Sequence, residues 1–540
     1  MIIKLLLLIV MSILVILKTK RNLHMLQQNL YNENNRYIKW LKKDMNSFSI
    51  IEFVALLVLF LSTSLLVDKD GITLIINIIF ILLEVFVILD FIKQRKKTTA
   101  KISFAITARI KRLIITISIF YLLVFLFFIL LQDQLWISSF LIFIYGIMTF
   151  LNPIIIYFAN AINKYTVEKL VYFYYKHKAV TKLKEMKNLN VIGITGSYGK
   201  TSSKNILADI LSIKYLTLPT PKNLNTPYGL IITVNNYLDK FYDVFIAEMG
   251  AYVEGEIKEL CDLVHPKYGI LTRIGTAHLE TFGSEEIIQK TKFELIESLP
   301  QDGIGVLNKD DEKQTSYHLK NNCRILWIGI ENSDVDVRAT NIKVNKDGTS
   351  FDVIFKGDRK KYPFTTRLLG AHNVYNILAG LALGKEFGIS ISQLQKAVKT
   401  IKPIEHRLEL KKIGNFYQID DAYNSNPIGA KNALEVLSMM PGVKIVVTPG
   451  MVELGSKEKE ENRRFGEEIA ELSQADYVIL IGKDKTKDIK EGLLSKKYKE
   501  DNIIVYNDVV DAYQFIRNLK TKKDIYALFE NDLPDIYNEK

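Results

Sequence analysis

The 540-residue chain has little of several features that would assign it quickly to a class. Its two cysteines, Cys261 and Cys323, form no disulfide framework and do not have metal-site spacing. We find no internal repeat, no long low-complexity tract and no nucleic-acid recognition motif with interleaved aromatic residues. The first apolar segment also lacks the small-residue cleavage site of a removable signal peptide. These absences argue against a disulfide-rich secreted protein and against nucleic-acid binding.

Long apolar runs, in contrast, fill about the first 160 residues, and the remainder has the composition of a soluble protein. Five segments approach the roughly 20 residues that a helix needs to cross a bilayer. They are Ile2–Leu17, Ile50–Val67, Thr73–Ile92, Leu113–Leu131 and Leu135–Phe158. Because five such segments follow one another, we predict about five transmembrane helices rather than buried helices of a soluble core. The first segment is the shortest.

The charge of the connecting loops predicts an orientation. Residues 18–43 hold seven Lys or Arg against one Glu, and residues 93–112 hold eight Lys or Arg and no acid. The loops at 68–70 and 132–134 are short and not basic. Because basic loops stay in the cytoplasm, the N-terminus is expected outside and everything after Phe158 inside a bacterial cytoplasmic membrane. The basic loops also explain part of the net charge of +12 and suit anionic lipid headgroups.

A glycine-rich turn, Gly193-Ile-Thr-Gly-Ser-Tyr-Gly-Lys-Thr201, lies between an apolar β-branched run and a helical pattern. In this order, backbone N–H groups of the loop and the helix N-terminus point at a phosphate. Lys200 can reach the terminal phosphates, and the Thr201 hydroxyl can hold Mg²⁺. The glycine spacing is that of a shorter variant of the general P-loop. We predict that ATP contacts Gly196, Ser197, Tyr198, Gly199, Lys200, Thr201 and Ser202.

The part after the membrane segments is long enough for two domains. Apolar runs alternate with helical patterns up to about Thr400, and a new cycle begins near Pro403, which predicts two α/β domains with mostly parallel sheets. Glu248 ends one predicted strand and His278 follows another, at the edge where open α/β sheets bind ligands. Glu248 is an ordinary Mg²⁺ ligand, whereas His278 is less typical because Mg²⁺ prefers oxygen.

Eight blocks of this part are similar, in the same order, to those of the Mur ligase family, ATP-dependent amide-forming enzymes of bacterial cell-wall precursor synthesis. The likeness is greatest to the MurF-like branch, which adds D-alanyl-D-alanine, and it covers about Val191 to the C-terminus. The blocks are Gly193–Thr201, Ala247–Gly250, Ala277–Ser284, Thr291–Glu294, Leu369–Asn376, His406–Arg407, Ile419–Pro427 and Gly450–Gly455.

The resemblance implies a mechanism and a set of site residues. ATP phosphorylates an acceptor carboxylate, an amine attacks the acyl phosphate, and phosphate leaves as the amide forms. Carried over by position, Lys200, Lys292 and His278 are implied to be catalytic, and Thr201, Glu248 and His278 to hold Mg²⁺. Lys292 matches the lysine that the family converts to a carbamate with CO₂. Further implied nucleotide contacts are Asn373 and Asn376 on the adenine side and Arg407 and Asp421 from the second domain, with Asn424 and Asn426 shaping its loop.

The resemblance and the apolar segments together predict four parts. These are a membrane domain over residues 1–160, a juxtamembrane linker helix over 161–189, a P-loop central ATP-binding domain over 190–401 and a Rossmann-like C-terminal domain over 402–540. The linker is rich in aromatic residues and lysines. It is expected either to lie along the membrane surface or to be a plain connecting helix.

Two departures from the family pattern bear on the substrate. Membrane segments stand where the D-alanyl-D-alanine-adding enzymes carry a small domain that grips the UDP sugar. The histidine that normally follows the glutamate of the Gly450–Gly455 block by nine residues is Asn462 here. Because this block lies in the domain that receives the amino component, the amine stays open, and so does the choice between a UDP-linked and a lipid-linked acceptor.

The sequence therefore predicts a membrane-anchored ligase that joins an amino acid or dipeptide to an envelope-precursor carboxylate at the bilayer, with ATP and Mg²⁺ and without nucleic acid. An ATP-driven transporter or nucleotide-gated regulator is the alternative. Its one support is Glu84, deep in the third segment, which either faces a partner or cavity or is a neutral, hydrogen-bonded side chain. An inactive scaffold fits poorly, because Lys200, Glu248, His278 and Lys292 are all present.

Overall fold

The computed structural model describes residues 2–29, 31–32, 36–43, 48–64, 70–95, 104–345, 347–422, 427–452, 454 and 457–531. The chain divides into two compact units, Met1–Tyr174 and Tyr175–Lys540. The division falls inside the predicted linker, 161–189, whose middle forms part of one long helix. Each unit is described by itself below.

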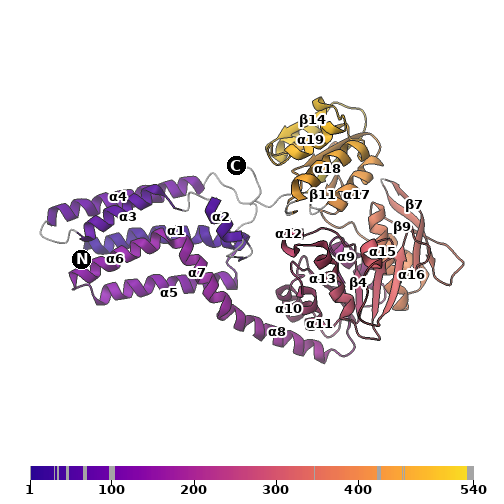
Figure 1. Cartoon of the computed structure of the whole chain (residues 1–540), viewed down its shortest axis with the longest axis horizontal. Coiled ribbons are helices and arrows are strands. Elements are labelled where there is room, and N and C mark those ends of the chain that lie inside the picture. Colours follow the sequence, from indigo (N-terminus) through magenta and orange to yellow (C-terminus); the bar gives the residue numbers. More distant parts are fainter. Residues whose placement is uncertain are drawn as a thin grey trace. The chain divides into compact units, whose positions relative to one another are not determined.

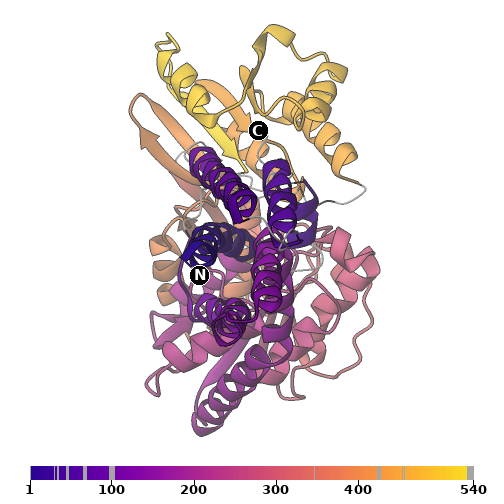
Figure 2. The ribbon, with the colours of Figure 1, turned by 90° about the vertical axis from the view of Figure 1, so that its left-hand side faces the viewer.

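The N-terminal unit is a bundle of long helices, seen from the side in Figure 1 and end-on in Figure 2. Its helices are α1 (Ile2–Gln28), α2 (Ile38–Lys43), α3 (Ile50–Ser64), α4 (Asp70–Arg95), α5 (Ala108–Leu130), α6 (Leu135–Phe150), α7 (Asn152–Tyr165) and α8 (Val167–Glu185). Helix α1 packs against α4, α6 and α7, and α5 packs against α6 and α7.

Polar groups lie inside this bundle while large apolar side chains cover its surface. Leu82, Leu122 and Phe140 are each 60% exposed or more. In the interior, the buried Lys18 ammonium lies 2.8 Å from Glu52 Oε1. Buried Glu84 has an oxygen, Oε2, without a hydrogen-bond partner in the described part of the chain. This distribution is expected of helices surrounded by lipid, where ionisable groups turn toward the bundle interior.

The bundle differs from the five predicted spans in two places. Among the described residues, three helices are long and apolar enough to cross a membrane, Ile2–Gln28, Gly71–Lys93 and Ala108–Leu130, or four if one bent pair counts as a span. The predicted fifth span is that pair, because the chain turns by 81° between α6 and α7. Pro153, near the start of α7, lacks an N–H and favours a helix start there. Helix α3 has 15 residues, and the end of its predicted span lies outside the described residues.

Lys18 also satisfies the backbone where α6 stops. Its ammonium donates hydrogen bonds to the carbonyls of Thr149 (3.1 Å) and Phe150 (3.2 Å), which lie in the last turn of α6. These carbonyls have no partner from a continuing helix, and leaving such groups unpaired in an apolar setting costs free energy. The bend between α6 and α7 is therefore stabilised by a residue of α1.

The second unit contains two sheets, and the larger one begins with the parallel strands that the sequence predicts. The strands are β1 (Asn190–Thr195), β2 (Thr217–Pro219), β3 (Val244–Glu248), β4 (Tyr268–Leu271), β5 (Ile304–Asn308), β6 (Arg324–Gly329), β7 (Val337–Asn345), β8 (Gly348–Phe355) and β9 (Tyr362–Thr366). Their order in the sheet is β2-β3-β1-β4-β5-β6-β7-β8-β9, with β1 to β6 parallel. Strands β7, β8 and β9 form an antiparallel extension that was not predicted.

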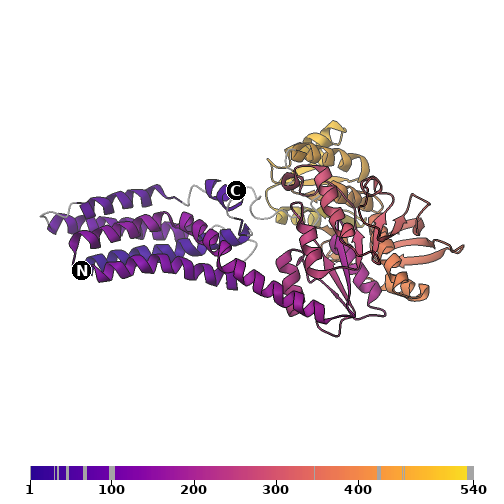
Figure 3. The same ribbon diagram turned by 60° about the horizontal axis from the view of Figure 1, so that its bottom comes forward.

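Helices pack on this sheet, as Figure 3 shows. They are α9 (Lys200–Leu211), α10 (Pro227–Asn236), α11 (Glu256–Val264), α12 (Leu279–Phe282), α13 (Glu285–Glu297), α14 (Glu312–Thr315), α15 (Ala371–Glu386) and α16 (Ile391–Thr400). Helices α9 and α15 approach closely because α15 has Gly380 at the contact, where a Cβ would lie 2.5 Å from Ile210 Cδ1. Ser390 and Gln393 form a capping box at the start of α16, where a helix was predicted.

The smaller sheet is the second predicted α/β arrangement. Its strands are β10 (Glu409–Ile413), β11 (Phe416–Asp421), β12 (Val443–Thr448), β13 (Tyr477–Ile481), β14 (Ile503–Tyr506) and β15 (Ile525–Glu530), in the order β10-β11-β15-β12-β13-β14. All neighbouring pairs are parallel except β10 with β11. The helices are α17 (Pro427–Ser438), α18 (Glu458–Leu472), α19 (Lys487–Ser495), the short η4 (Glu500–Asn502) and α20 (Val509–Asn518).

Candidate functional site

The predicted phosphate-binding loop joins the end of β1 to the start of α9. Two of its glycines have backbone conformations that other residues rarely adopt, with φ of 149° at Gly196 and 81° at Gly199. A Cβ on Gly196 would lie 1.9 Å from Thr272 Oγ1, and one on Gly199 would lie 3.3 Å from Asn376 Oδ1. The loop therefore requires glycine for its conformation and for the close approach of two neighbouring segments.

Lys200 folds back over this loop. Its ammonium donates hydrogen bonds to the carbonyls of Gly196 (2.8 Å) and Ser197 (3.2 Å). Removal from water lowers the pKa of Lys200, the carboxylate of Glu248 opposes that change, and the charge of Arg407 adds to it. Glu248 and Arg407 therefore both lie within electrostatic range of Lys200.

Glu248 is the centre of a polar cluster beside the loop. Its residue pairs with Ile194 across β1 and β3, so its side chain lies where the strand leads into the glycine turn. Oε1 accepts hydrogen bonds from Thr201 Oγ1 (3.1 Å) and Asn225 Nδ2 (3.0 Å). Oε2 lies 3.0 Å from Lys204 Nζ, with both side chains 2% exposed. Carboxylate and hydroxyl oxygens are the ligands that Mg²⁺ prefers, so Thr201 and Glu248 fit that ion.

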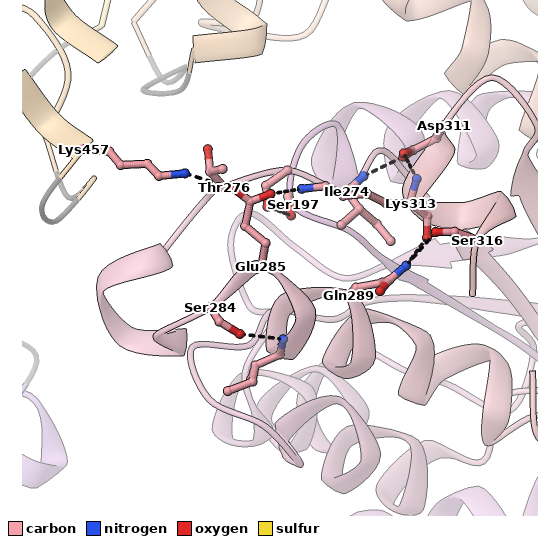
Figure 4. Close-up of polar contacts among 12 residues, drawn as sticks. Ser197, Ile274, Thr276, Ser284, Glu285, Gln289, Asp311, Lys313, Ser316 and Lys457 are labelled. Carbon is pink, nitrogen blue, oxygen red and sulfur yellow. Dashed lines mark hydrogen bonds and ion pairs between the residues drawn. The ribbon is translucent and has the colours of Figure 1, made fainter. Parts of the chain in front are cut away.

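The segment after β4 closes over the glycine loop. The N–H groups of Ser197 and Tyr198 donate to the Arg273 carbonyl at 2.9 and 3.3 Å. A Cβ on Gly275 would lie 2.2 Å from Cε2 of the Tyr198 ring, so the ring packs directly on this glycine. Asp311 also holds this segment, because its Oδ2 accepts the N–H of Ile274 at 2.9 Å (Figure 4).

His278 is the third residue predicted to hold Mg²⁺. It precedes α12 with a left-handed φ of 60°, and its ring lies 4.5 Å from that of Tyr252, measured between centroids. Within the described residues, no group of three or more His, Cys, Asp or Glu side chains is placed to hold a metal ion. Of the predicted set of Thr201, Glu248 and His278, the first two are in direct contact, and the role of His278 as a ligand stays a prediction.

Lys292, from α13, is a buried lysine whose charge is opposed by Lys200 and favoured by Glu256 and Glu294. It is 2% exposed, and its ammonium lies 5.3 Å from the centroid of the Phe282 ring. Burial, followed by the nearby charge of Lys200, lowers the pKa of Lys292 to about 7. A substantial fraction of this side chain is therefore a neutral amine at neutral pH.

Of the two asparagines predicted near adenine, Asn376 lies at the glycine loop through its contact with Gly199. Asn373 instead donates from Nδ2 to the carbonyl of Leu369 at 2.9 Å, which closes the turn before α15. Asn424 and Asn426, predicted to shape the loop after β11, lie outside the described residues.

Arg407 stands in a turn held by two consecutive aspartates of β11. The flanking residues have left-handed φ values, 59° at His406 and 50° at Leu408. Asp420 Oδ2 lies 2.9 Å from His406 Nδ1, and Asp421 Oδ1 accepts the N–H of Leu408 at 3.1 Å. A left-handed φ costs free energy in residues other than glycine. The contacts of Asp420 and Asp421 therefore stabilise the strained backbone on both sides of Arg407.

Comparison with known proteins agrees with this geometry. The model of the Mur ligase middle domain matches residues 194–384, and that of the Mur ligase glutamate ligase domain matches residues 406–529. A UDP-N-acetylmuramoyl-tripeptide–D-alanyl-D-alanine ligase of Bacillus subtilis is 31% identical over 339 residues, 62% of this chain and 71% of that protein. The chain belongs to the Mur ligase family.

The ligase of the same name from Escherichia coli is 33% identical over 295 residues, which are 54% of this chain. The match spans 64% of that relative, less than two thirds of its length. Among solved structures, MurF of Acinetobacter baumannii is 26% identical, with a TM-score of 0.59 over 67% of this chain and 77% of that one. MurF of Thermotoga maritima in complex with ADP is 25% identical, with a TM-score of 0.59 over 67% and 80%.

Asn462, the departure from the Mur ligase pattern, has a structural role. The buried side chain accepts the N–H of Met451 at Oδ1 (2.9 Å) and donates from Nδ2 to the carbonyls of Met451 and Glu458 (2.9 Å each). It therefore ties the Gly450 turn to the start of α18. Glu453, the reference point for the missing histidine, lies outside the described residues.

Four polar residues of this Mur ligase site were not predicted from the sequence. Lys204 and Asn225 contact Glu248. Glu530 is fully buried and faces Asp421 across β11 and β15. Glu285 at the start of α13 lies between Lys313 and Lys457, which is 3.1 Å away (Figure 4). Only Lys204 had a usable signal, because it lies one helical turn after Lys200.

Proposed function

We propose that this chain is a membrane-anchored, ATP-dependent amide ligase that acts through an acyl phosphate in cell-envelope precursor synthesis. One observation carries the proposal. In a Mur ligase chain, the glycine loop places Lys200 and Thr201 against a buried Glu248, with Arg407 and Lys292 in electrostatic range of Lys200. That grouping suits a triphosphate, whose charge needs cations and backbone N–H groups around it.

The chemistry requires two displacements. An oxygen of the acceptor carboxylate attacks the γ-phosphorus of ATP, and ADP leaves with the electron pair of the broken P–O bond. The amine nitrogen then attacks the acyl carbon, and inorganic phosphate leaves as the amide forms and the nitrogen loses a proton. Lys200 is placed to move from its loop carbonyls to the transferring phosphate, and Arg407 to add positive charge there. Mg²⁺, held by Thr201 and Glu248, would neutralise phosphate charge when bound.

Lys292 fits the carbamate role that its family position implies. Only the neutral amine reacts with CO₂, and a pKa of about 7 makes that form abundant. The reaction forms an N–C bond, releases one proton and leaves an anionic carbamate. The new negative charge would replace a buried positive charge beside Lys200, which relieves the repulsion between the two lysines. With His278 and Glu248, the carbamate would orient the metal.

The acceptor is proposed by class. The relatives are named as ligases of UDP-N-acetylmuramoyl-tripeptide and D-alanyl-D-alanine, which supports an envelope carboxylate and an amino acid or dipeptide as substrates. The apolar bundle replaces the UDP-sugar-binding part of the MurF-like pattern. We therefore favour an acceptor that is lipid-linked, presented at the cytoplasmic surface of the membrane. The exposed apolar side chains of Leu82, Leu122 and Phe140 on the bundle surface support membrane anchoring.

The decisive experiment uses the full chain in detergent with ATP and Mg²⁺. Phosphate release is measured with a soluble UDP-linked peptide or a lipid-linked peptide, each with and without D-alanyl-D-alanine, and products are identified by mass spectrometry. We expect release only when acceptor and amine are both present, and none from Lys200→Ala. ATP hydrolysis that needs neither substrate, and that is coupled to flux in liposomes, would instead identify a transporter.

A further inference from the structure

A group of exposed apolar side chains lies on one side of the catalytic unit, around α10. We call it the α10 patch; its exposed fractions are 52% for Leu216, 47% for Tyr228, 41% for Ile232, 50% for Tyr237 and 68% for Phe241. Single exposed apolar residues are common on soluble proteins. Five within 26 residues, three of them aromatic, are unusual for a surface that faces only water.

The fold makes these five residues one surface. Helix α10 packs against α11, and the chain leads from α10 into β3, the neighbour of the edge strand β2. Tyr228 and Ile232 are four residues apart and share a face of the helix. Leu216 is tied to the segment after α10, because its N–H donates to Asp243 Oδ2 (2.8 Å) and its carbonyl accepts the N–H of Asp243 (2.9 Å). Phe241 lies two residues before Asp243 in the sequence and therefore close to Leu216.

The patch begins at the catalytic cluster. Asn225, which donates to Glu248, is three residues before Tyr228, and Thr226 caps α10 between them. The helix then runs away from the active edge of the sheet, since the chain enters β3 only at Val244 and returns along that strand to Glu248. The α10 patch therefore has one end next to the Glu248 cluster.

The other end of the patch is close in chain length to the membrane bundle. Asn235, at the end of α10, donates from Nδ2 to the carbonyl of Tyr175 at 3.0 Å. Tyr175 follows Phe158, the end of the last predicted span, by 17 positions. At about 1.5 Å per residue, a helical segment of this length is roughly 25 Å long. The length of this segment limits how far Tyr175 can lie from the end of that span.

The charges around the patch favour an anionic surface. Lys176 and Lys178 follow Tyr175 on α8, and the Lys240 ammonium lies 5.4 Å from the centroid of the Phe241 ring. The nearby carboxylates already accept backbone N–H groups, Asp239 from Lys240 and Asp243 from Leu216. Aromatic rings with lysines are the usual composition of a protein surface that sits among lipid headgroups.

We propose that the α10 patch is a membrane-docking surface that rests on anionic lipid headgroups and holds the acceptor site at the bilayer. It deepens the function proposed above, because a site opening at the lipid surface selects acceptors whose reactive carboxylate is carried on a lipid. The docking proposal and the ligase proposal can be contradicted independently of each other. Ligase activity in detergent does not need the patch, and docking does not need ATP.

The docking test uses the full chain with an environment-sensitive fluorophore, NBD, attached at Phe241→Cys. Val510→Cys, on α20 and 55% exposed, is the matched control, and the native Cys261 and Cys323 are buried. The labelled protein is placed in phosphatidylcholine vesicles with or without phosphatidylglycerol. We expect a blue shift at position 241, and quenching by lipid-borne nitroxide, that grow with phosphatidylglycerol and are absent at position 510.

If the NBD emission reports the same polarity at positions 241 and 510, the docking proposal is wrong. A blue shift at position 241 without quenching by the nitroxide lipid also overturns it, because protein then covers the patch, whether from a second copy or from the bundle. If quenching at position 241 is the same with and without phosphatidylglycerol, the proposed contact with anionic headgroups is wrong.

The functional arm compares Tyr237→Ser/Phe241→Ser with the control Val509→Ser/Val510→Ser. We expect the first pair to lower the rate on a lipid-linked acceptor in vesicles by about tenfold, since two interfacial aromatics contribute on the order of 1 kcal/mol or more. The rate on a soluble acceptor in detergent should stay unchanged. Equal rates in vesicles for both pairs, or an equal loss in detergent, contradict the proposal.

Discussion

At the scale of single residues, two buried ionisable groups have pKa values shifted toward their neutral forms. Lys292 is a base whose pKa is lowered to about 7, and Glu530 is an acid whose pKa is raised well above 4.5 by burial and by Asp421 beside it. Such perturbed groups cluster at functional sites. Lys292 leads to a prediction on ligase activity, and Glu530 leads to a prediction on the free energy of unfolding.

Replacing Lys292 tests the carbamate. Lys292→Arg keeps a positive charge but has no neutral amine to react with CO₂, so we expect ligase activity to fall by about a hundredfold, at the upper end for lost metal-orienting groups. Wild-type activity should decline after CO₂ is removed and return with bicarbonate, measured by phosphate release. Full activity in Lys292→Arg, or indifference of the wild type to CO₂, would contradict the carbamate.

Glu530 predicts a pH dependence of stability. Below about pH 4.5 the carboxyl is protonated in both the folded and unfolded states. As the pH rises, the unfolded chain releases this proton first, so the stability contributed by protonated Glu530 is lost as the pH rises through its folded pKa. Glu530→Gln keeps a neutral hydrogen-bonding group that does not ionise. Its stability relative to wild type should therefore increase above pH 4.5, by at most about 1.4 kcal/mol per pH unit.

Thermal unfolding of both proteins between pH 4 and 8 measures this difference. Glu312→Gln, at an exposed position, is the control and should show no such trend. A constant difference between Glu530→Gln and wild type across this range would show that Glu530 is ionised in the folded protein.

At the scale of elements, the site depends on two segments that pack on the glycine loop. The segment after β4 accepts two loop N–H groups at the Arg273 carbonyl, and α15 brings Asn376 against Gly199. A bound triphosphate needs those loop N–H groups. The loop and the segment after β4 must therefore move together when the nucleotide binds.

Gly275→Ala tests this coupling. Its Cβ would lie 2.2 Å from the Tyr198 ring, so the ring must shift and displace the loop. We expect the Kd for ATP to rise by about tenfold, or roughly 1.4 kcal/mol, measured by titration of the purified chain. Gly71→Ala, where a Cβ meets nothing within 4 Å, is the control. An unchanged Kd would mean that the Tyr198 contact has no part in nucleotide binding.

The sequence predicted these elements unevenly, for physical reasons. Buried parallel strands such as β13 are short apolar runs between turns, and the predicted bounds 477–481 are those observed. Strands β7 to β9 alternate more buried with more exposed residues, so they lack the continuous apolar run by which the buried parallel strands were predicted. The bend at Leu151 was missed because Pro153 lies inside a continuous apolar run. Contacts such as Lys204 with Glu248 depend on the fold and cannot be read from spacing alone.

At the scale of the whole molecule, the proposal joins a membrane bundle to a catalytic unit. The topology makes a further prediction, which follows from the basic loops at 18–43 and 93–112. A tag at the C-terminus should be inaccessible in intact cells and become accessible when the inner membrane is opened, whereas one at the N-terminus should be accessible from outside. The protein should stay with the membrane after alkaline carbonate extraction.

Protease protection of the two tags in spheroplasts measures this orientation. An even number of spans would place both tags on one side. The bent pair α6–α7 decides this number, because it either crosses the bilayer or re-enters on the same side. A C-terminal tag accessible from outside the cell would rule out catalysis with cytoplasmic ATP.

The ammonium of Lys18 has a practical consequence for work with shortened proteins. It forms an ion pair with Glu52 and also donates hydrogen bonds to the last carbonyls of α6. A truncation that removes α1 would therefore leave the Glu52 carboxylate and the carbonyls of Thr149 and Phe150 without Lys18 as a partner in the apolar interior of the bundle. Such a truncation is expected to destabilise the remaining helices. A soluble version of the enzyme should instead be cut inside α8, where the chain itself divides at Tyr174 and Tyr175.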